Sequence, residues 1–424
     1  MNSIGFKVIE NDAYLNGHKL SDLAKKYKTP LYVMDDVHIN YALNEYKNNF
    51  KGNHFEGKVV YASKAFLTPY IMELVSKYDL YMDAVSLGDL YLAKRSGFNM
   101  EHIVFHGNNK SIEELTYALE NKVGIIVVDN LFELSLLSSL VKEKTNILIR
   151  VNPGIDAHTH KYIQTAKFTS KFGESIYDEE IIDKLISKIK ENKLINLLGF
   201  HAHIGSQIHE TEAFSIEVDK MVDFQCHVAT KYGLNLPVLN LGGGFGIKYT
   251  KDEKALEISQ MMKVLSSELD KKLKNSTMIK TVMIEPGRSI VGPAGMTLYT
   301  ISQVKPTFGG KNYLFIDGGM TDNIRPALYD ATYECDVVNK MNMKKEIKVD
   351  VVGKCCESGD IIREDVLVPT ISTNDILVVY ATGAYNYSMS SNYNSILKPM
   401  VIAVGEDVKI ISRREKLEDL YRLF

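Results

Sequence analysis

The chain has 424 residues, of which 45% are hydrophobic and 24% are charged, and its formal net charge is −3 at pH 7. This length exceeds one average core, so we expect two globular domains, and the mixed charges exclude the basic tract of a nucleic-acid-binding protein. The 4 cysteines are too few for a disulfide scaffold, no apolar run approaches the roughly 20 residues that span a bilayer, and the N-terminus lacks the layout of a secretion signal. We therefore expect a cytoplasmic protein that binds neither nucleic acid nor membranes.

The first part of the chain is predicted to combine short strands with two helices. Strands are expected at 6–9, 13–15 and 31–34, and helices at 21–27 and 37–50.

A regular alternation of strands and helices begins at Val59. Three later strands, with longer helical connections, are expected at 197–201, 238–241 and 281–284. Eight short apolar strands that alternate with helices favour a (β/α)₈ barrel over an open doubly wound sheet, although the periodicity fits both. The first five strand candidates follow each other at intervals of about 22 residues and begin near Val59, Tyr81, His102, Gly124 and Asn146.

The pattern changes after Pro293. Strand-like runs separated by turn residues replace the helices, and almost no helix is expected before Glu415. This predicts an all-β domain that also takes in the N-terminal strands. We place the barrel at 35–292 and the β domain at 1–34 and 293–424.

Lys64 closes the first barrel strand, in the stretch VVYASKAF at 59–66. Burying an unpaired ammonium costs several kcal/mol or more, and desolvation favours the neutral amine, which is nucleophilic toward aldehydes. This indicates Schiff-base chemistry, for which pyridoxal phosphate is the usual aldehyde. The alternative is a lysine that has passed the rim of the sheet and reached water, and the stretch alone favours that alternative.

Other strand ends carry groups that suit such a cofactor. The glycines of GGGFG at 242–246 offer backbone N–H groups to a phosphate, although a plain tight turn explains them about as well. EPGR at 285–288 offers a carboxylate for a pyridine nitrogen, or else forms a surface turn with an ion pair. Asp83 and His203 follow two further strands.

Two histidine pairs have spacings that could suggest a metal site. They are His201 with His203 and His158 with His160, and no Asp, Glu or Cys lies at a supporting spacing. We therefore expect no metal.

Six motifs occur in one order along the chain, namely YASKA, HIGSQ, GGGFG, EPGRS, CESGD and GAY. In this order and spacing they resemble the alanine-racemase-like, or type III, pyridoxal-phosphate decarboxylases, over about 31–399. The resemblance implies a barrel with a β domain, pyridoxal phosphate as cofactor and α-decarboxylation of an amino acid.

The resemblance also implies roles for single residues on the cofactor. Lys64 would hold the cofactor as a Schiff base, His203 would stack on its ring and Glu285 would pair with its nitrogen. Asp83 would support Lys64 and His203. The remaining cofactor contacts, mainly to the phosphate, would come from Ser206, Gly242, Gly243, Gly244, Gly287, Arg288 and the Tyr385 hydroxyl.

The substrate and the partner subunit are implied in the same way. Cys356 would protonate the carbanion after carbon dioxide leaves, and Glu357 would bind the substrate's distal ammonium. In the family this segment reaches into the neighbouring subunit's site, which implies a homodimer with shared sites. The groups on the substrate carboxylate would be Arg288, Arg325, Tyr329 and Tyr385.

The chain departs from the family pattern at two positions beside Cys356. Lys354 replaces the usual proline, which is expected to loosen the loop. Cys355 is an extra thiol, which leaves two candidates for the acid. Two adjacent cysteines are also a normal finding in a buried strand.

A distal ammonium together with a distal carboxylate explains why one site needs Glu357 and two arginines. We therefore expect meso-2,6-diaminopimelate as substrate and L-lysine as product. An arginine, ornithine, lysine or carboxynorspermidine decarboxylase stays open, as do an amino-acid racemase and a carrier of pyridoxal phosphate without catalysis. A barrel enzyme that binds a sugar phosphate explains the glycines but not Lys64 with Glu285.

Overall fold

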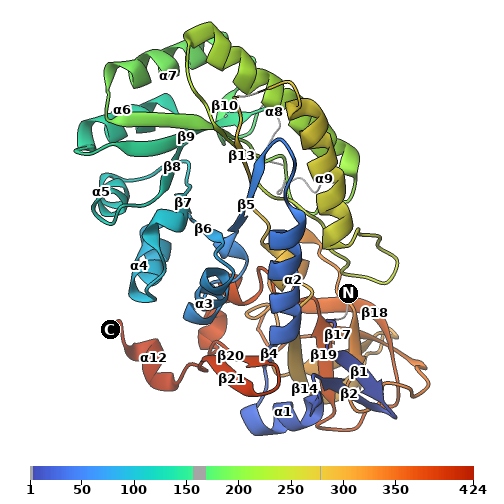
Figure 1. Cartoon of the computed structure of the whole chain (residues 1–424). Helices are drawn as coiled ribbons and strands as arrows, with labels where there is room; N and C mark the ends of the chain where they lie inside the picture. Colours follow the sequence, from blue (N-terminus) through green and yellow to red (C-terminus); the bar gives the residue numbers. More distant parts are fainter. Residues whose placement is uncertain (1–2, 156–168, 277) are drawn as a thin grey trace. The chain divides into compact units, whose positions relative to one another are not determined.

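The computed structural model describes residues 3–155, 169–276 and 278–424, and the chain forms two compact units (Figure 1). The barrel unit comprises Leu43–Gly246 and Leu256–Gly287. The β unit comprises Met1–Ala42, Ile247–Ala255 and Arg288–Phe424.

Within the described residues, eight parallel strands close into the predicted barrel. Neighbouring strands pair in the order β5-β6-β7-β8-β9-β11-β12-β13, and β13 pairs again with β5. The strands are β5 (Glu56–Tyr61), β6 (Tyr81–Ala84), β7 (Ile103–Phe105), β8 (Ile125–Val128), β9 (Thr145–Asn152), β11 (Ile195–His201), β12 (Val238–Asn240) and β13 (Thr281–Ile284).

Helices connect the strands, as the alternation predicts. Ser111 and Asn130 are the N-caps of two of these helices, because each side chain accepts the N–H of the residue three positions later. A short strand, β10 (Glu174–Ser175), pairs with β9. The helices are α3 (Pro69–Lys77), α4 (Leu87–Arg95), α5 (Ile112–Glu120), α6 (Leu131–Leu140), α7 (Glu179–Glu191), α8 (Thr211–Tyr232) and α9 (Ile258–Leu273).

The interior of the barrel is apolar in the middle and polar toward the carboxyl ends of the strands. The apolar layer consists of Val60, Val104, Ile125, Val127, Leu148 and Met283. Residues two positions apart on a strand share a face, so the next inward residues belong to the carboxyl end. They include His106 after Val104, Arg150 after Leu148 and Glu285 after Met283.

The β unit is built around β14 (Gly295–Pro306). This strand pairs with β4 (Leu31–Asp35) near the chain's start, so the prediction that N-terminal strands join the β domain is confirmed. The order in the main sheet is β18-β17-β15-β14-β4-β20-β21. The other strands are β15 (Asn312–Ile316), β16 (Cys335–Val337), β17 (Ile347–Val352), β18 (Ile361–Val368), β19 (Ile376–Tyr380), β20 (Met400–Val404) and β21 (Val408–Ser412).

Smaller elements complete the chain. A separate three-stranded sheet of β1 (Phe6–Ile9), β2 (Asp12–Leu15) and β3 (His18–Lys19) precedes α1 (Leu20–Tyr27). The remaining helices are α2 (Asp36–Asn49), α10 (Arg288–Val291), α11 (Arg325–Tyr329) and α12 (Leu417–Tyr421). Among the residues that the structure describes, no helix is both long and apolar enough to cross a membrane.

Candidate active site

Lys64 lies in a short 3₁₀ turn, Ser63–Ala65, directly after β5. Its side chain is exposed, and β5 ends at Tyr61, so Lys64 follows the strand and does not close it. The Ala62 N–H donates to the Pro286 carbonyl at 3.0 Å, which ties the turn to the loop after β13.

Asp83 fixes the turn that carries Lys64. Its buried carboxylate accepts the Ser63 N–H at 2.5 Å. Burial raises the pKa of Asp83 to about 6, although the nearby His106 lowers it. Near neutral pH most of this carboxyl is therefore ionised, and its charge acts on Lys64.

Glu285 follows β13 and is held by three buried side chains. His106 Nε2 lies 2.8 Å from Oε1, His201 Nε2 lies 3.3 Å from Oε2, and Asn240 Nδ2 donates to Oε1 at 2.8 Å. Burial alone raises the pKa of Glu285, but His106 and His201 hold it well below its usual range. The structure thus keeps an anion at the carboxyl end of the barrel.

His201, the last residue of β11, is buried, His203 two positions later is half-buried, and both are uncharged near neutral pH. Burial lowers the pKa of His201 to about 4, and it holds the pKa of His203 well below its usual range, with a further contribution from Lys64. The Gly243 N–H donates to His203 Nδ1 at 3.2 Å, so this ring carries its proton on Nε2. His203 is therefore a neutral ring beside the lysine.

The glycine loop allows backbones to approach closely. A Cβ on Gly243 would lie 2.1 Å from the Glu285 carbonyl oxygen, and a Cβ on Gly244 would lie 2.5 Å from the Gly205 carbonyl oxygen. A Cβ on Gly287 would lie 2.7 Å from the Ala62 Cβ. These glycines are required by the junction of strand ends, whatever else they bind.

Two of the glycines have partners for their backbone N–H groups inside the barrel unit. The Gly242 N–H donates to Asn240 Oδ1 at 2.8 Å, and the Gly243 N–H donates to His203. Their role as phosphate donors stays a prediction. Gly244 and Gly287 stay predicted donors, together with Ser206 in the loop after β11.

Two partners of Glu285, His106 and Asn240, escaped the sequence analysis, as did Arg150. His106, Asn240 and Arg150 stand at strand ends, which is the one signal that could have marked them. The Arg150 guanidinium lies 4.4 Å from the centre of the Phe172 ring. Burial lowers its pKa, and the charges of Asp129 and Glu285 oppose that shift.

A carboxylate does lie near two of the histidines, contrary to what their sequence spacing indicated. Ligand atoms of His106, His201 and Glu285 lie within 4.8 Å of one another, so the fold supplies the carboxylate that sequence spacing did not. The three side chains already pair through hydrogen bonds. The absence of a metal stays a prediction, and His158 and His160 lie outside the described residues.

The β unit contains a cluster of arginines and tyrosines. Arg288 hydrogen-bonds the Tyr249 hydroxyl, and its guanidinium lies 4.7 Å from the centre of the Tyr385 ring. Arg325 Nε donates to the Tyr333 hydroxyl at 2.7 Å, and both arginines are buried.

Aromatic rings surround Arg325 on several sides. Its guanidinium lies 5.3 Å from the Tyr329 ring and 5.7 Å from the Tyr385 ring. Burial lowers the pKa of Arg325, yet contacts with Tyr333 and Tyr249 raise it overall. Two permanent cations in a tyrosine cage suit an anionic group of a ligand. Tyr249 and Tyr333 were missed because no motif marks them.

Cys356 and Glu357 lie on an exposed loop of the β unit rather than in this cluster. The Asp360 carboxylate accepts the N–H groups of Cys355, at 2.8 Å, and of Met320, at 2.6 Å. Burial and Asp360 raise the pKa of the Cys355 thiol to about 11. Of the two thiols, that of Cys356 is the exposed one.

The Lys354 N–H donates to the Gly318 carbonyl at 3.1 Å. Proline has no N–H, so the residue that departs from the family pattern adds a hydrogen bond. That Lys354 loosens the loop stays a prediction, which this hydrogen bond opposes.

The polar residues of the barrel unit and the arginine and tyrosine cluster of the β unit both suit pyridoxal phosphate in their chemistry. The barrel unit holds an amine on a fixed turn, a buried carboxylate for a pyridinium, a neutral imidazole and close-packed glycines. The buried His201 Nδ1 has no hydrogen-bond partner among the described residues, which leaves an acceptor at this polar end of the barrel.

Comparisons with known proteins identify the family. A family profile, "Pyridoxal-dependent decarboxylase, pyridoxal binding domain", matches residues 37–292. The chain is 42% identical to the diaminopimelate decarboxylase of Bacillus subtilis over 95% of this chain and 92% of the relative, and 41% identical to that of Staphylococcus aureus over 96% of each.

Solved structures agree with this likeness. Diaminopimelate decarboxylase from M. jannaschii, in complex with L-lysine, superposes with a TM-score of 0.92 at 32% identity, over 99% of this chain and 98% of that chain. The Helicobacter pylori enzyme, also complexed with L-lysine, gives 0.87 at 30% identity over 95% and 98%. The expected family and fold are confirmed. The chain belongs to the pyridoxal-dependent decarboxylases, with pyridoxal phosphate as cofactor, and within them to the diaminopimelate decarboxylases.

Proposed function

We propose that the protein removes the carboxylate at the D-configured centre of meso-2,6-diaminopimelate, giving L-lysine and carbon dioxide. The observation that carries the proposal is the pair of buried arginines, Arg288 and Arg325, inside a tyrosine cage. A substrate that keeps a second carboxylate far from the reacting carbon needs such cations, whereas ornithine or lysine has only a distal amine.

Residues of the barrel unit bind the cofactor in this proposal. Pyridoxal phosphate supplies an aldehyde for the substrate amine and a ring that accepts electrons. Lys64 would hold the cofactor covalently, Glu285 would keep a proton on the pyridine nitrogen, and His203 would stack on the ring. Asp83 holds the turn of Lys64 through Ser63. The phosphate would be bound by Gly242, Gly243, Gly244, Gly287 and Ser206 of the barrel unit, with Arg288 and the Tyr385 hydroxyl of the β unit.

Residues of the β unit act on the substrate. Arg288, Arg325 and Tyr329, with Tyr385, bind the distal carboxylate, and Glu357 binds the distal ammonium. The Cys356 thiol delivers the proton that replaces the carboxyl group at the reacting carbon. The high pKa of Cys355, caused by burial and Asp360, favours a supporting place for that thiol in the loop.

Further, we infer a cytoplasmic homodimer whose sites are shared between subunits. Exposed apolar side chains stand where strands lead into helices of the barrel unit: Val85 is 40% exposed, Ile112 59%, Phe132 78% and Tyr177 56%. These side chains offer apolar surface to a partner subunit, which supports the inference. The exposed loop with Cys356 and Glu357 supports the same inference.

The test is carbon dioxide release from meso-diaminopimelate, ornithine, arginine and carboxynorspermidine, compared by kcat/KM. We expect meso-diaminopimelate to exceed the others by at least about 100-fold, because unpaired buried arginines penalise substrates without a distal carboxylate. Carboxynorspermidine is the second candidate, since it also carries a distal carboxylate. A higher kcat/KM for any of the other three compounds would refute the proposal.

A further inference from the structure

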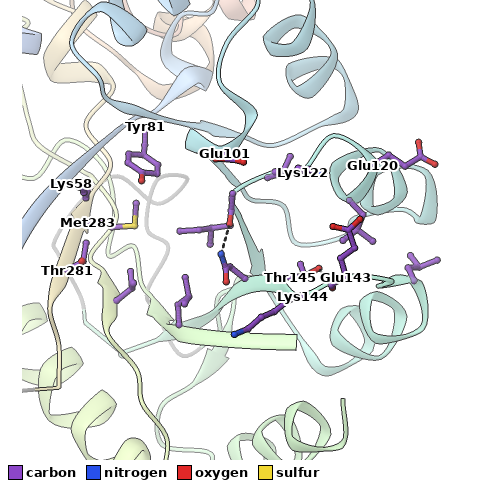
Figure 2. Close-up of a pocket in the computed structure, with 18 of the residues that line it drawn as sticks. Lys58, Tyr81, Glu101, Glu120, Lys122, Glu143, Lys144, Thr145, Thr281 and Met283 are labelled. Carbon is purple, nitrogen blue, oxygen red and sulfur yellow. Dashed lines mark hydrogen bonds between the residues drawn. The ribbon is translucent and has the colours of Figure 1, made fainter. Parts of the chain in front are cut away.

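A pocket of about 770 Å³ opens at the amino ends of the barrel strands (Figure 2). Its lining includes the first residues of several strands, among them Tyr81 of β6, Thr145 of β9 and Thr281 of β13. Parallel strands present their amino ends on one side, so this pocket lies at the opposite end of the barrel from Asp83 and Glu285.

The apolar layer of the barrel closes the inner end of the pocket. Ile125 and Met283 belong both to that layer and to the lining. Val60, Val104 and Leu148 behind them are 0% exposed. The pocket is therefore a site of its own, separated from the polar carboxyl end by packed side chains.

Apolar and aromatic surfaces form the inner walls. Leu198 and Val238 pack against the apolar layer and line the pocket. The Tyr81 ring stacks on His102, with ring centres 4.5 Å apart and an angle of 13° between the planes, and this holds the ring in place. A fixed ring beside apolar walls suits a flat apolar body.

Among the described lining residues, Lys58 is the charged one that is half-buried. The Lys58 side chain is 35% exposed, whereas the other charged lining residues are exposed at the rim. Lys58 shares the inward face of β5 with Val60. Its partner Glu56, at 2.6 Å, is 62% exposed, so the carboxylate can turn to water and leave the ammonium to another anion.

We propose that this pocket binds a small anionic amphiphile, with a flat apolar body and one carboxylate or sulfonate. The body packs between Tyr81 and Met283, and the anion pairs with Lys58. This proposal rests on the barrel unit alone and does not depend on the substrate of the enzyme.

The probe is 8-anilinonaphthalene-1-sulfonate, which combines aromatic rings with one sulfonate and fluoresces when it leaves water. Titration of the holoenzyme should give one saturable site per chain with a Kd on the order of 10–100 μM, the usual range for a ligand of this size. Lys58→Met should weaken binding about tenfold, because a charge-assisted contact is lost. Lys142→Met, at the exposed rim, is the matched control and should stay within about twofold.

Two further variants secure the interpretation. Lys64→Ala alters the opposite end of the barrel and should leave the Kd unchanged within about twofold. Lys58→Gln replaces Lys58→Met if circular dichroism shows that the latter misfolds. The proposal is overturned if no saturable binding occurs, if the Lys58 variant binds as tightly as the wild type, or if Lys64→Ala abolishes binding.

Discussion

Glu285 is the residue on which the electronic part of the proposed reaction depends. Four strands of the barrel contribute to its position: β13 precedes it, and His106, His201 and Asn240 belong to three others. The anion is therefore placed before any cofactor arrives, which is the general condition for electrostatic catalysis.

Glu285→Gln tests this role with almost no change of shape. We expect kcat to fall about 100-fold to 1,000-fold, because a neutral amide cannot keep the pyridine nitrogen protonated. The KM should change little, since the substrate contacts lie elsewhere. Steady-state rates of carbon dioxide release, with the pyridoxal content measured in parallel, give the comparison. A kcat within threefold of the wild type would remove Glu285 from the mechanism.

Within the described part of the chain, Glu217 of α8 is a buried carboxyl group without the partners that Glu285 has. It is 0% exposed, and neither carboxylate oxygen has a hydrogen-bond partner among the described residues. Burial holds the pKa of Glu217 well above its usual range. The folded protein therefore binds this proton more tightly than the unfolded chain does. As a result, the contribution of Glu217 to stability is fully present below the unfolded-state pKa of about 4.3 and is lost as the pH rises.

Glu217→Gln removes this titration and should therefore stabilise the protein more at pH 8 than at pH 5. We expect an increase in the apparent melting temperature of about 2–4 °C at pH 8 and a smaller one at pH 5, measured by scanning calorimetry. Glu212→Gln, an exposed position on the same helix, is the control. Equal shifts at both pH values would mean that Glu217 is ionised in the folded protein or has a partner there.

At the scale of elements, the loop 353–360 is held mainly by backbone N–H groups. Lys354 donates to Gly318, and Cys355 donates to Asp360. Lys354→Pro removes the first donor, whereas Lys354→Ala keeps it and removes only an exposed side chain. We expect kcat to fall about tenfold in the proline variant and to stay near wild type in the alanine variant, because a shifted loop misplaces the Cys356 thiol. Equal rates in both variants would show that the hydrogen bond does not position the loop.

The elements themselves were largely predictable because their signals are local. The barrel strands are short apolar runs between turn residues, and the N-caps at Ser111 and Asn130 stand three residues before their acidic partners. Lys64 and Glu285 were recognised for the same reason, as each stands in a motif after a strand. The parallel pairing of β20 with β4 joins opposite ends of the chain and has no local signal.

The missed residues are those whose role depends on a distant partner. His106 meets Glu285 across 179 positions, and a histidine after an apolar strand is by itself a common core residue. From the sequence, Tyr333 looks like any buried aromatic residue, and its role follows only from the hydrogen bond that Arg325 donates to its hydroxyl. The hydrogen bond from the Gly243 N–H to His203 likewise joins two distant loops, and no local pattern predicts it.

At the scale of the whole molecule, the proposed homodimer divides one site between two chains. Lys64 and Glu285 belong to the barrel unit, and Cys356 lies on the exposed loop of the β unit. If each site takes its lysine from one subunit and its thiol from the other, two inactive variants can complement each other. A site built by a single chain cannot be restored in this way.

Lys64→Ala and Cys356→Ala should each be nearly inactive alone. When equal amounts are dissociated and reassociated together, about half of the dimers are mixed and each mixed dimer contains one intact site. We therefore expect about one quarter of the wild-type rate of carbon dioxide release. The control is Lys64→Ala mixed with Glu285→Gln. Both changes fall in the barrel unit, and the loop with Cys356 is intact in both variants. In that mixture each site takes its barrel residues from one chain, so no intact site forms and the rate should stay at the level of the separate variants. A rate for the first mixture no higher than that of the control would show that Cys356 serves the barrel of its own chain.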